Sequence, residues 1–135
     1  MLDRAKKDLS VSQKLFNGFS DELDLEISAY HLQQGIEKLM KFEMEVNDIP
    51  YPFVHDLRKL FDVASNGGLE MPEWIWEHSS LLNTYESKTR YGDNLVATKR
   101  EIEGFLVLAQ AYAEAVIKRT TTETSQNSVS HYMGK

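Results

Sequence analysis

The chain lacks cysteine, long apolar runs and a recognisable secretory leader. None of its 135 residues is cysteine, which excludes disulfide frameworks and thiolate chemistry and suits a reducing cytoplasm. No stretch approaches the roughly 18 uninterrupted apolar residues that a membrane-spanning helix needs. The N-terminal "MLDRAKKDLS" is polar and does not resemble a secretory signal. Together these absences predict a cytoplasmic protein without a membrane span.

Positive charge is also scarce. The chain has 15 Lys and Arg against 21 Asp and Glu, a formal net charge of −6. Proteins that coat nucleic acid through phosphate attraction are usually basic. A generic DNA-coating role is therefore excluded, whereas a local basic patch stays open.

The patterns that mark metal sites and common catalytic loops are missing. The four histidines lie on separate segments without metal-ligand spacing, and they are His31, His55, His78 and His131. The adjacent glycines at 67–68 follow Asn66 and read as a helix stop, not as a phosphate loop. No serine nucleophile motif occurs. The sequence therefore predicts no metal and no cofactor.

Apolar residues recur three or four positions apart through most of the chain, which predicts helices. We expect helices over about 2–19, 21–46, 54–65 and 95–119, and one that starts near Pro72 and ends before a loop at 87–94. This order predicts an all-α protein, an antiparallel up-and-down bundle of four to five helices spanning 1–119. The Ser/Thr-rich segment 120–135 is aperiodic, and we expect a disordered polar tail there.

One helix carries a regular polar stripe within "AYHLQQGIEKLMKF". His31, Gln34, Lys38 and Lys41 follow one another at spacings of three and four residues, so they share one face of the helix. The simpler interpretation is a solvated face, with Glu37 and Lys41 as a pair one turn apart. The other interpretation is a face that binds a ligand.

Two further short motifs carry polar residues at the ends of helices. In "HDL", His55 and Asp56 precede a helix, where side chains can cap free backbone N–H groups. In "RYGD", Arg90 can satisfy the last carbonyls of a helix or hold a phosphate in a bidentate manner, and Tyr91 can stack on a base.

The order of these motifs on this helix pattern resembles the HEPN family (higher eukaryotes and prokaryotes nucleotide-binding). The motifs are "H-x-Q-Q-x-x-E-K-x-x-K", "HDL" and "RYGD", and the resemblance covers roughly residues 2–118. It implies a helical bundle that commonly dimerises. It also implies one of three roles: a partner of a nucleotidyltransferase protein, a metal-independent ribonuclease of a toxin–antitoxin system, or a domain fused to larger proteins.

The chain departs from the family's ribonuclease pattern. Those enzymes use Arg-x4-6-His, and no arginine here has a histidine at that distance; Arg90 is followed by Asn94 and Leu95 instead. The departure favours a non-catalytic module that dimerises and binds a nucleotide, RNA or a nucleotidyltransferase. The alternatives are a ribonuclease that uses His31 or His55 with Arg90, and a purely structural assembly protein.

A groove and a dimer interface complete the sequence-based predictions. We expect the polar stripe to face the loop that carries Arg90 and Tyr91, so that both sides contact one phosphate-bearing ligand. Trp76 points about 200° around its helix from Trp74, so both cannot face the same core. Trp76 and Tyr30 have no assured place in the core of a monomer, which favours a homodimer.

Overall fold

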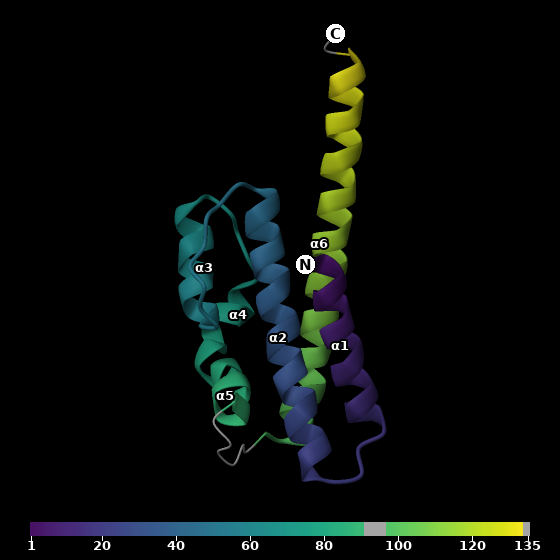
Figure 1. Cartoon of the computed structure of the whole chain (residues 1–135), viewed down its shortest axis with the longest axis vertical. Helices are drawn as coiled ribbons and strands as arrows, with labels where there is room; N and C mark the ends of the chain where they lie inside the picture. Colours follow the sequence, from purple (N-terminus) through teal and green to yellow (C-terminus); the bar gives the residue numbers. More distant parts are fainter. Residues whose placement is uncertain (91–96, 134–135) are drawn as a thin grey trace.

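The computed structural model describes the backbone of residues 1–90 and 97–133, and side chains within 1–88 and 97–121. These residues form a helical bundle, which confirms the predicted all-α class (Figure 1). Its elements are α1 (Leu2–Asn17), α2 (Glu22–Val46), α3 (Leu57–Asn66), α4 (Glu73–Glu77), α5 (Ser79–Arg90) and α6 (Lys99–Met133).

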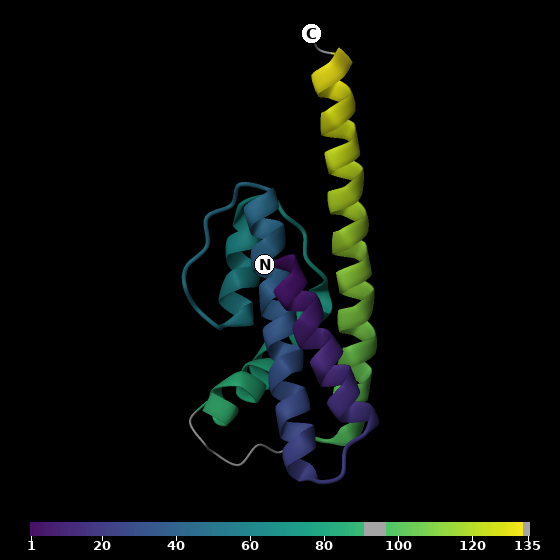
Figure 2. The ribbon, with the colours of Figure 1, turned by 45° about the vertical axis from the view of Figure 1, so that its right-hand side comes forward.

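The long helices α1, α2 and α6 pack side by side, and α3 to α5 cover the other flank of α2 (Figures 1 and 2). α1 is antiparallel to α2, whereas α6 runs in the same direction as α2 (Figure 1). The segment around Pro50 and Pro52 is not helical and returns the chain before α3 begins. α2 is therefore the central helix, and polar residues on its surface meet partners from several elements.

α1 and α2 approach each other closely. A methyl group built on Gly35 would lie 2.6 Å from Leu9 Cδ2, so any larger residue there would force Leu9 to shift. One turn further along α1, the buried hydroxyls of Ser12 and Ser28 each donate to the other residue's carbonyl, at 2.7 and 2.8 Å. The junction is tight because its residues are small and its polar groups are all bonded.

The helix predicted after Pro72 divides in two at His78. The Ser79 hydroxyl donates to the Trp76 carbonyl at 2.9 Å, and this competes with the regular helical pattern. α4 therefore ends at Glu77 and α5 begins at Ser79. The preceding helix, α3, begins at Leu57 instead of near residue 54, because Asp56 caps it and Asn83 Oδ1 accepts from the Leu57 N–H at 3.0 Å.

α6 begins with a capping box. The Thr98 hydroxyl accepts from the Glu101 N–H at 3.1 Å, and Glu101 Oε1 accepts from the Thr98 N–H at 3.3 Å. The backbone then stays helical to Met133 and leaves the bundle (Figures 1 and 2), although the sequence led us to expect disorder from residue 120. The boundary between a bundle at 1–119 and a tail stays a prediction.

The core consists of apolar side chains from all six elements. Its largest fully buried members include Leu32, Ile36 and Met40 on α2, Leu60 on α3 and Ile102 on α6. Among the described residues, no helix combines the length and the apolar character needed to cross a membrane.

Candidate functional site

The polar face of α2, formed by His31, Gln34, Lys38 and Lys41, lies against the protein instead of pointing freely into solvent. His31 and Lys38 are partly exposed, and Gln34 is buried. Each of the four side chains has a hydrogen-bond partner inside the chain. The face is therefore neither a plain solvated surface nor a set of free cations.

Asp8 of α1 joins two of these residues. Its Oδ1 accepts from His31 Nδ1 at 2.8 Å, and its Oδ2 forms an ion pair with Lys38 Nζ. The Asp8 side chain is only 13% exposed, so the single carboxylate is largely shielded by the two basic groups. Because a carboxylate can only accept, the Nδ1–H of His31 must donate, which leaves the other ring nitrogen, Nε2, for another partner.

Glu37 of α2 also holds one histidine and one lysine, on the side of α2 that faces α3. Its Oε1 accepts from His55 Nδ1 at 2.9 Å, and its Oε2 accepts from Lys41 Nζ at 3.1 Å. The Glu37–Lys41 pair agrees with the pair proposed from sequence, but Glu37 is 4% exposed, so the pair is not a solvated one. Lys41 also lies over the Tyr51 ring, 5.8 Å from its centroid.

Two glutamines extend this network into the bundle. Gln34 Nε2 donates to Gln33 Oε1 at 2.7 Å, and Gln33 Nε2 donates to the His55 carbonyl at 3.0 Å. Both side chains are buried. Gln34 therefore contributes to the internal network and offers little surface to a ligand.

His55 and Asp56, predicted together as caps, have different roles. Asp56 Oδ1 accepts from the N–H groups of Arg58 at 3.0 Å and Lys59 at 3.4 Å, so it caps α3. The same oxygen accepts from Asn83 Nδ2 of α5 at 2.9 Å. The His55 side chain instead contacts Glu37, so it belongs with the polar face of α2.

The opposite wall of the predicted groove lies outside what the structure describes. Arg90 is the last residue of α5, but its side chain lies outside the described residues, and Tyr91 lies outside them entirely. The juxtaposition of the polar face with these two residues stays a prediction.

A second buried carboxylate centre was not predicted from the sequence. Glu43 of α2 accepts from the Tyr112 hydroxyl at 2.9 Å and from Arg119 Nη2 at 2.8 Å, both on α6. Burial and the nearby Glu43 charge raise the pKa of Tyr112 well above its ordinary value, although Arg119 partly offsets this. The signal was available, since Glu43 lies seven residues after Ile36 on the apolar stripe of α2.

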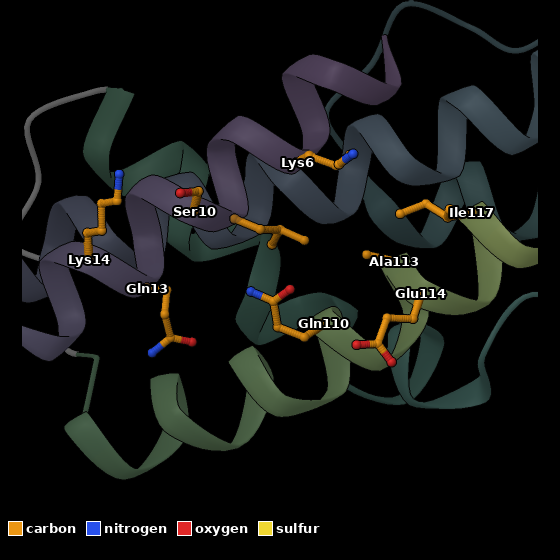
Figure 3. Close-up of a pocket in the computed structure, with 9 residues that line it drawn as sticks. Lys6, Ser10, Gln13, Lys14, Gln110, Ala113, Glu114 and Ile117 are labelled. Atoms are coloured by element: carbon orange, nitrogen blue, oxygen red, sulfur yellow. The ribbon is translucent and has the colours of Figure 1, made fainter.

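Surface grooves lie away from the polar face. One groove of about 410 Å³ separates α1 from α6, with Leu9 and Ala113 among its lining residues. Figure 3 shows Gln13 and Gln110 in the gap between the two helices and Lys14 turned away from α6. The groove also has polar lining residues, with Lys6 and Lys14 on the α1 side and Glu114 on the α6 side.

Another groove, of about 610 Å³, includes Phe61 of α3 and Trp76 of α4. Trp76 is 37% exposed, as the sequence predicted, but the Arg58 guanidinium stacks on its ring at 3.9 Å. Trp74 packs on Phe105 of α6, with ring centroids 6.5 Å apart. Within the described part of the chain, no three His, Asp or Glu side chains gather in a way that could hold a metal ion.

The chain matches the model of a known domain family. A family model for the HEPN domain matches residues 1–120, which includes all of α1 to α5 and most of the bundled part of α6. No curated protein and no solved structure matches the chain. The match agrees with the resemblance carried by the histidine, lysine and arginine motifs, and it spans most of the 135 residues. The chain therefore belongs to the HEPN domain family.

Proposed function

We propose that this chain is a non-catalytic HEPN module that dimerises and binds a phosphate-bearing ligand, a nucleotide or RNA, on the polar face of α2. One observation carries the proposal. Two carboxylates, Asp8 and Glu37, hold two lysines and two histidines on one side of the central helix. These basic side chains are gathered on one face, although the chain as a whole carries a net charge of −6.

The carboxylates position this basic cluster but also compete with a ligand. Each one fixes a histidine through Nδ1 and leaves Nε2 free, and in the imidazolium form the Nε2–H can donate to a phosphate oxygen. Each one also neutralises a lysine, which weakens that lysine's attraction for phosphate. We therefore expect modest affinity that falls as salt concentration rises.

The competition provides a sharp test. Asp8→Asn removes the charge that restrains His31 and Lys38, so it should strengthen binding of ATP or labelled single-stranded RNA several-fold. Lys38→Ala should weaken binding by a similar factor. Lys7→Ala, at an exposed position on α1, is the matched control and should change little. Calorimetry for ATP and fluorescence anisotropy for RNA provide the measurements.

Two results would contradict the phosphate site. If Asp8→Asn leaves affinity unchanged, the cluster is a structural ion-pair network. If neither ATP nor RNA binds while a nucleotidyltransferase protein does, and Lys38→Ala abolishes that contact, the face binds protein instead.

A second candidate function is metal-independent RNA cleavage. It is favoured by the two histidine–carboxylate pairs, Asp8–His31 and Glu37–His55, because a carboxylate on Nδ1 orients an imidazole for proton transfer through Nε2. Cleavage of RNA by the pure protein in EDTA, lost in His31→Ala or His55→Ala, would support the enzyme. Intact RNA under those conditions supports the binding module.

A further inference from the structure

The outward side of α6 carries a continuous apolar stripe that the bundle does not cover. Val107 is 67% exposed and Leu108 is 36% exposed, although they are adjacent on one helix. Residues one turn before and after them are small and surface-facing. Together they form what we call the α6 seam: Gly104, Val107, Leu108, Ala111 and Ala115.

Charges at the two ends of the α6 seam have opposite sign. Glu103 precedes it, and Lys118 and Arg119 follow it; all three are exposed. Glu103 and Lys118 have no ion-pair partner among the described residues, whereas Arg119 is partly engaged by Glu43. If a second copy of the helix lies antiparallel to the first, the acidic end of each seam therefore meets the basic end of the other.

We propose that the α6 seam is the interface between two copies of this chain, with the two α6 helices antiparallel about Ala111. A two-fold interface must be complementary to itself. Glu103 and Lys118 lie eight and seven residues from Ala111, so the antiparallel register places Glu103 of one copy beside Lys118 of the other. A parallel pairing would place like charges together. The proposal rests on the dimer in the proposed function and specifies its interface.

The same register matches large side chains with small ones. Val107 and Ala115 each lie four residues from Ala111, so the valine of one copy meets the alanine of the other. Two grooves flank the seam, with volumes of about 480 and 390 Å³, and Ala111 lines both. Ala111 forms the ridge between these grooves, and its small side chain keeps the ridge low. A second helix can therefore approach closely while its neighbouring side chains enter the grooves.

The first experiment measures mass in solution. Light scattering of the full chain should give twice the 15.5 kDa of one copy. Val107→Glu would bury two unpaired carboxylates at the interface and should raise the dimer dissociation constant at least about tenfold. Leu23→Glu, at a 59% exposed position on α2, is the matched control and should not affect the dimer.

The outcomes distinguish a failure of the proposed interface from a failure of the proposed dimer. A wild-type monomer contradicts the dimer of the proposed function, and the interface with it. A wild-type dimer that Val107→Glu leaves intact, with circular dichroism showing a folded variant, contradicts the α6 seam alone.

A charge exchange tests the end-to-end pairing. Glu103→Lys and Lys118→Glu should each weaken the homodimer, because each places like charges opposite one another. Mixing the two variants should restore a dimer, since the heterodimer has two opposite-charge pairs. Failure of the mixture to recover dimer would contradict the proposed register.

Cross-linking gives a measurement that does not depend on affinity. The chain has no cysteine, so single introduced cysteines report only on designed contacts. Ala111→Cys should form a disulfide between copies. Gly104→Cys should not, because the two Gly104 positions would lie about 20 Å apart along the seam. A mixture of Gly104→Cys and Lys118→Cys should cross-link. Efficient self-linking of Gly104→Cys would indicate a parallel pair and overturn the proposal.

Discussion

Tyr112 on α6 donates its hydroxyl hydrogen to Glu43 on α2, at 2.9 Å, and so connects residues 69 positions apart in the chain. Both side chains are buried. The Arg119 guanidinium contacts the other carboxylate oxygen, so both oxygens of Glu43 have partners.

Tyr112→Phe should destabilise the protein by about 2 kcal/mol, because it removes a hydrogen bond to a buried charged group and leaves one oxygen of Glu43 without that donor. Chemical denaturation provides the free energy of unfolding. Tyr30→Phe is the control, since no hydrogen bond of the Tyr30 hydroxyl occurs among the described residues and its ring contact with His31 is retained. Equal changes in the free energy of unfolding for the two substitutions would show that the hydrogen bond to Glu43 does not stabilise the fold.

Stability should fall in alkaline solution. Burial and the hydrogen bond to Glu45 raise the pKa of Tyr51 to about 12, and burial with the Glu43 charge raises the pKa of Tyr112 further above its ordinary value. Unfolded tyrosine ionises near pH 10, so above that pH the unfolded chain binds fewer protons than the folded chain. The contribution of these two tyrosines to the free energy of unfolding is therefore complete below about pH 10. It is lost as the pH rises toward their pKa values in the folded protein.

The measurement is denaturant unfolding at several pH values from about pH 9 upward. The double variant Tyr51→Phe/Tyr112→Phe should show a shallower decline than wild type, because two groups with raised pKa are gone. A decline of unchanged slope would assign the alkaline effect to other groups such as Tyr85, whose pKa is also raised by burial.

Asp8→Asn should cost about 1–2 kcal/mol of stability, since it weakens two contacts that tie α1 to α2. The loss is modest because His31 and Lys38 keep access to water. Asp62→Asn, at an exposed position on α3, should change stability little. If Asp8→Asn lowers stability while ligand affinity rises, the carboxylate both holds the helices and restrains the basic groups.

Two glycine-to-alanine substitutions should change the stability of the protein in opposite directions. Gly35→Ala would force a methyl group to 2.6 Å from Leu9 Cδ2, and Leu9 is itself buried, so we expect a net loss of about 1–2 kcal/mol. Gly104→Ala meets nothing within 4 Å and should gain about 0.5–1 kcal/mol from helix propensity. Thermal unfolding at low protein concentration compares the pair, and matching signs would contradict the packing explanation.

Thr98→Ala should destabilise α6 by about 1 kcal/mol, because it removes the hydroxyl that accepts from the Glu101 N–H. Thr121→Ala, at an exposed position far along the same helix, is the control. Hydrogen exchange at the first turn of α6 should rise in Thr98→Ala alone, and no change there would rule out a capping role.

The helical class was predictable because apolar residues such as Leu32, Ile36 and Leu39 repeat with the helical period, and they are indeed buried. The break at His78 was not, because the apolar stripe continues through it. The capping box at Thr98 and Glu101 has the usual Thr-x-x-Glu spacing and was therefore readable from the sequence.

The basic residues of the polar face were predictable from their spacing, but their partners were not. Asp8 meets Lys38 across 30 positions, and Glu37 meets His55 across 18, and no local pattern encodes such pairing. A face that looks cationic in sequence is therefore largely neutralised in the structure. Only the packing of α1 and α3 against α2 reveals this.

The close junction of α1 and α2 also has a consequence for the order of folding. Ser12 and Ser28 are only 16 residues apart, so their contact closes a short loop at low entropic cost, whereas the Glu43–Tyr112 contact closes a far longer one. We expect the α1–α2 hairpin to belong to the folding nucleus and the docking of α6 to follow it. Gly35→Ala should then slow refolding, and Tyr112→Phe should mainly accelerate unfolding.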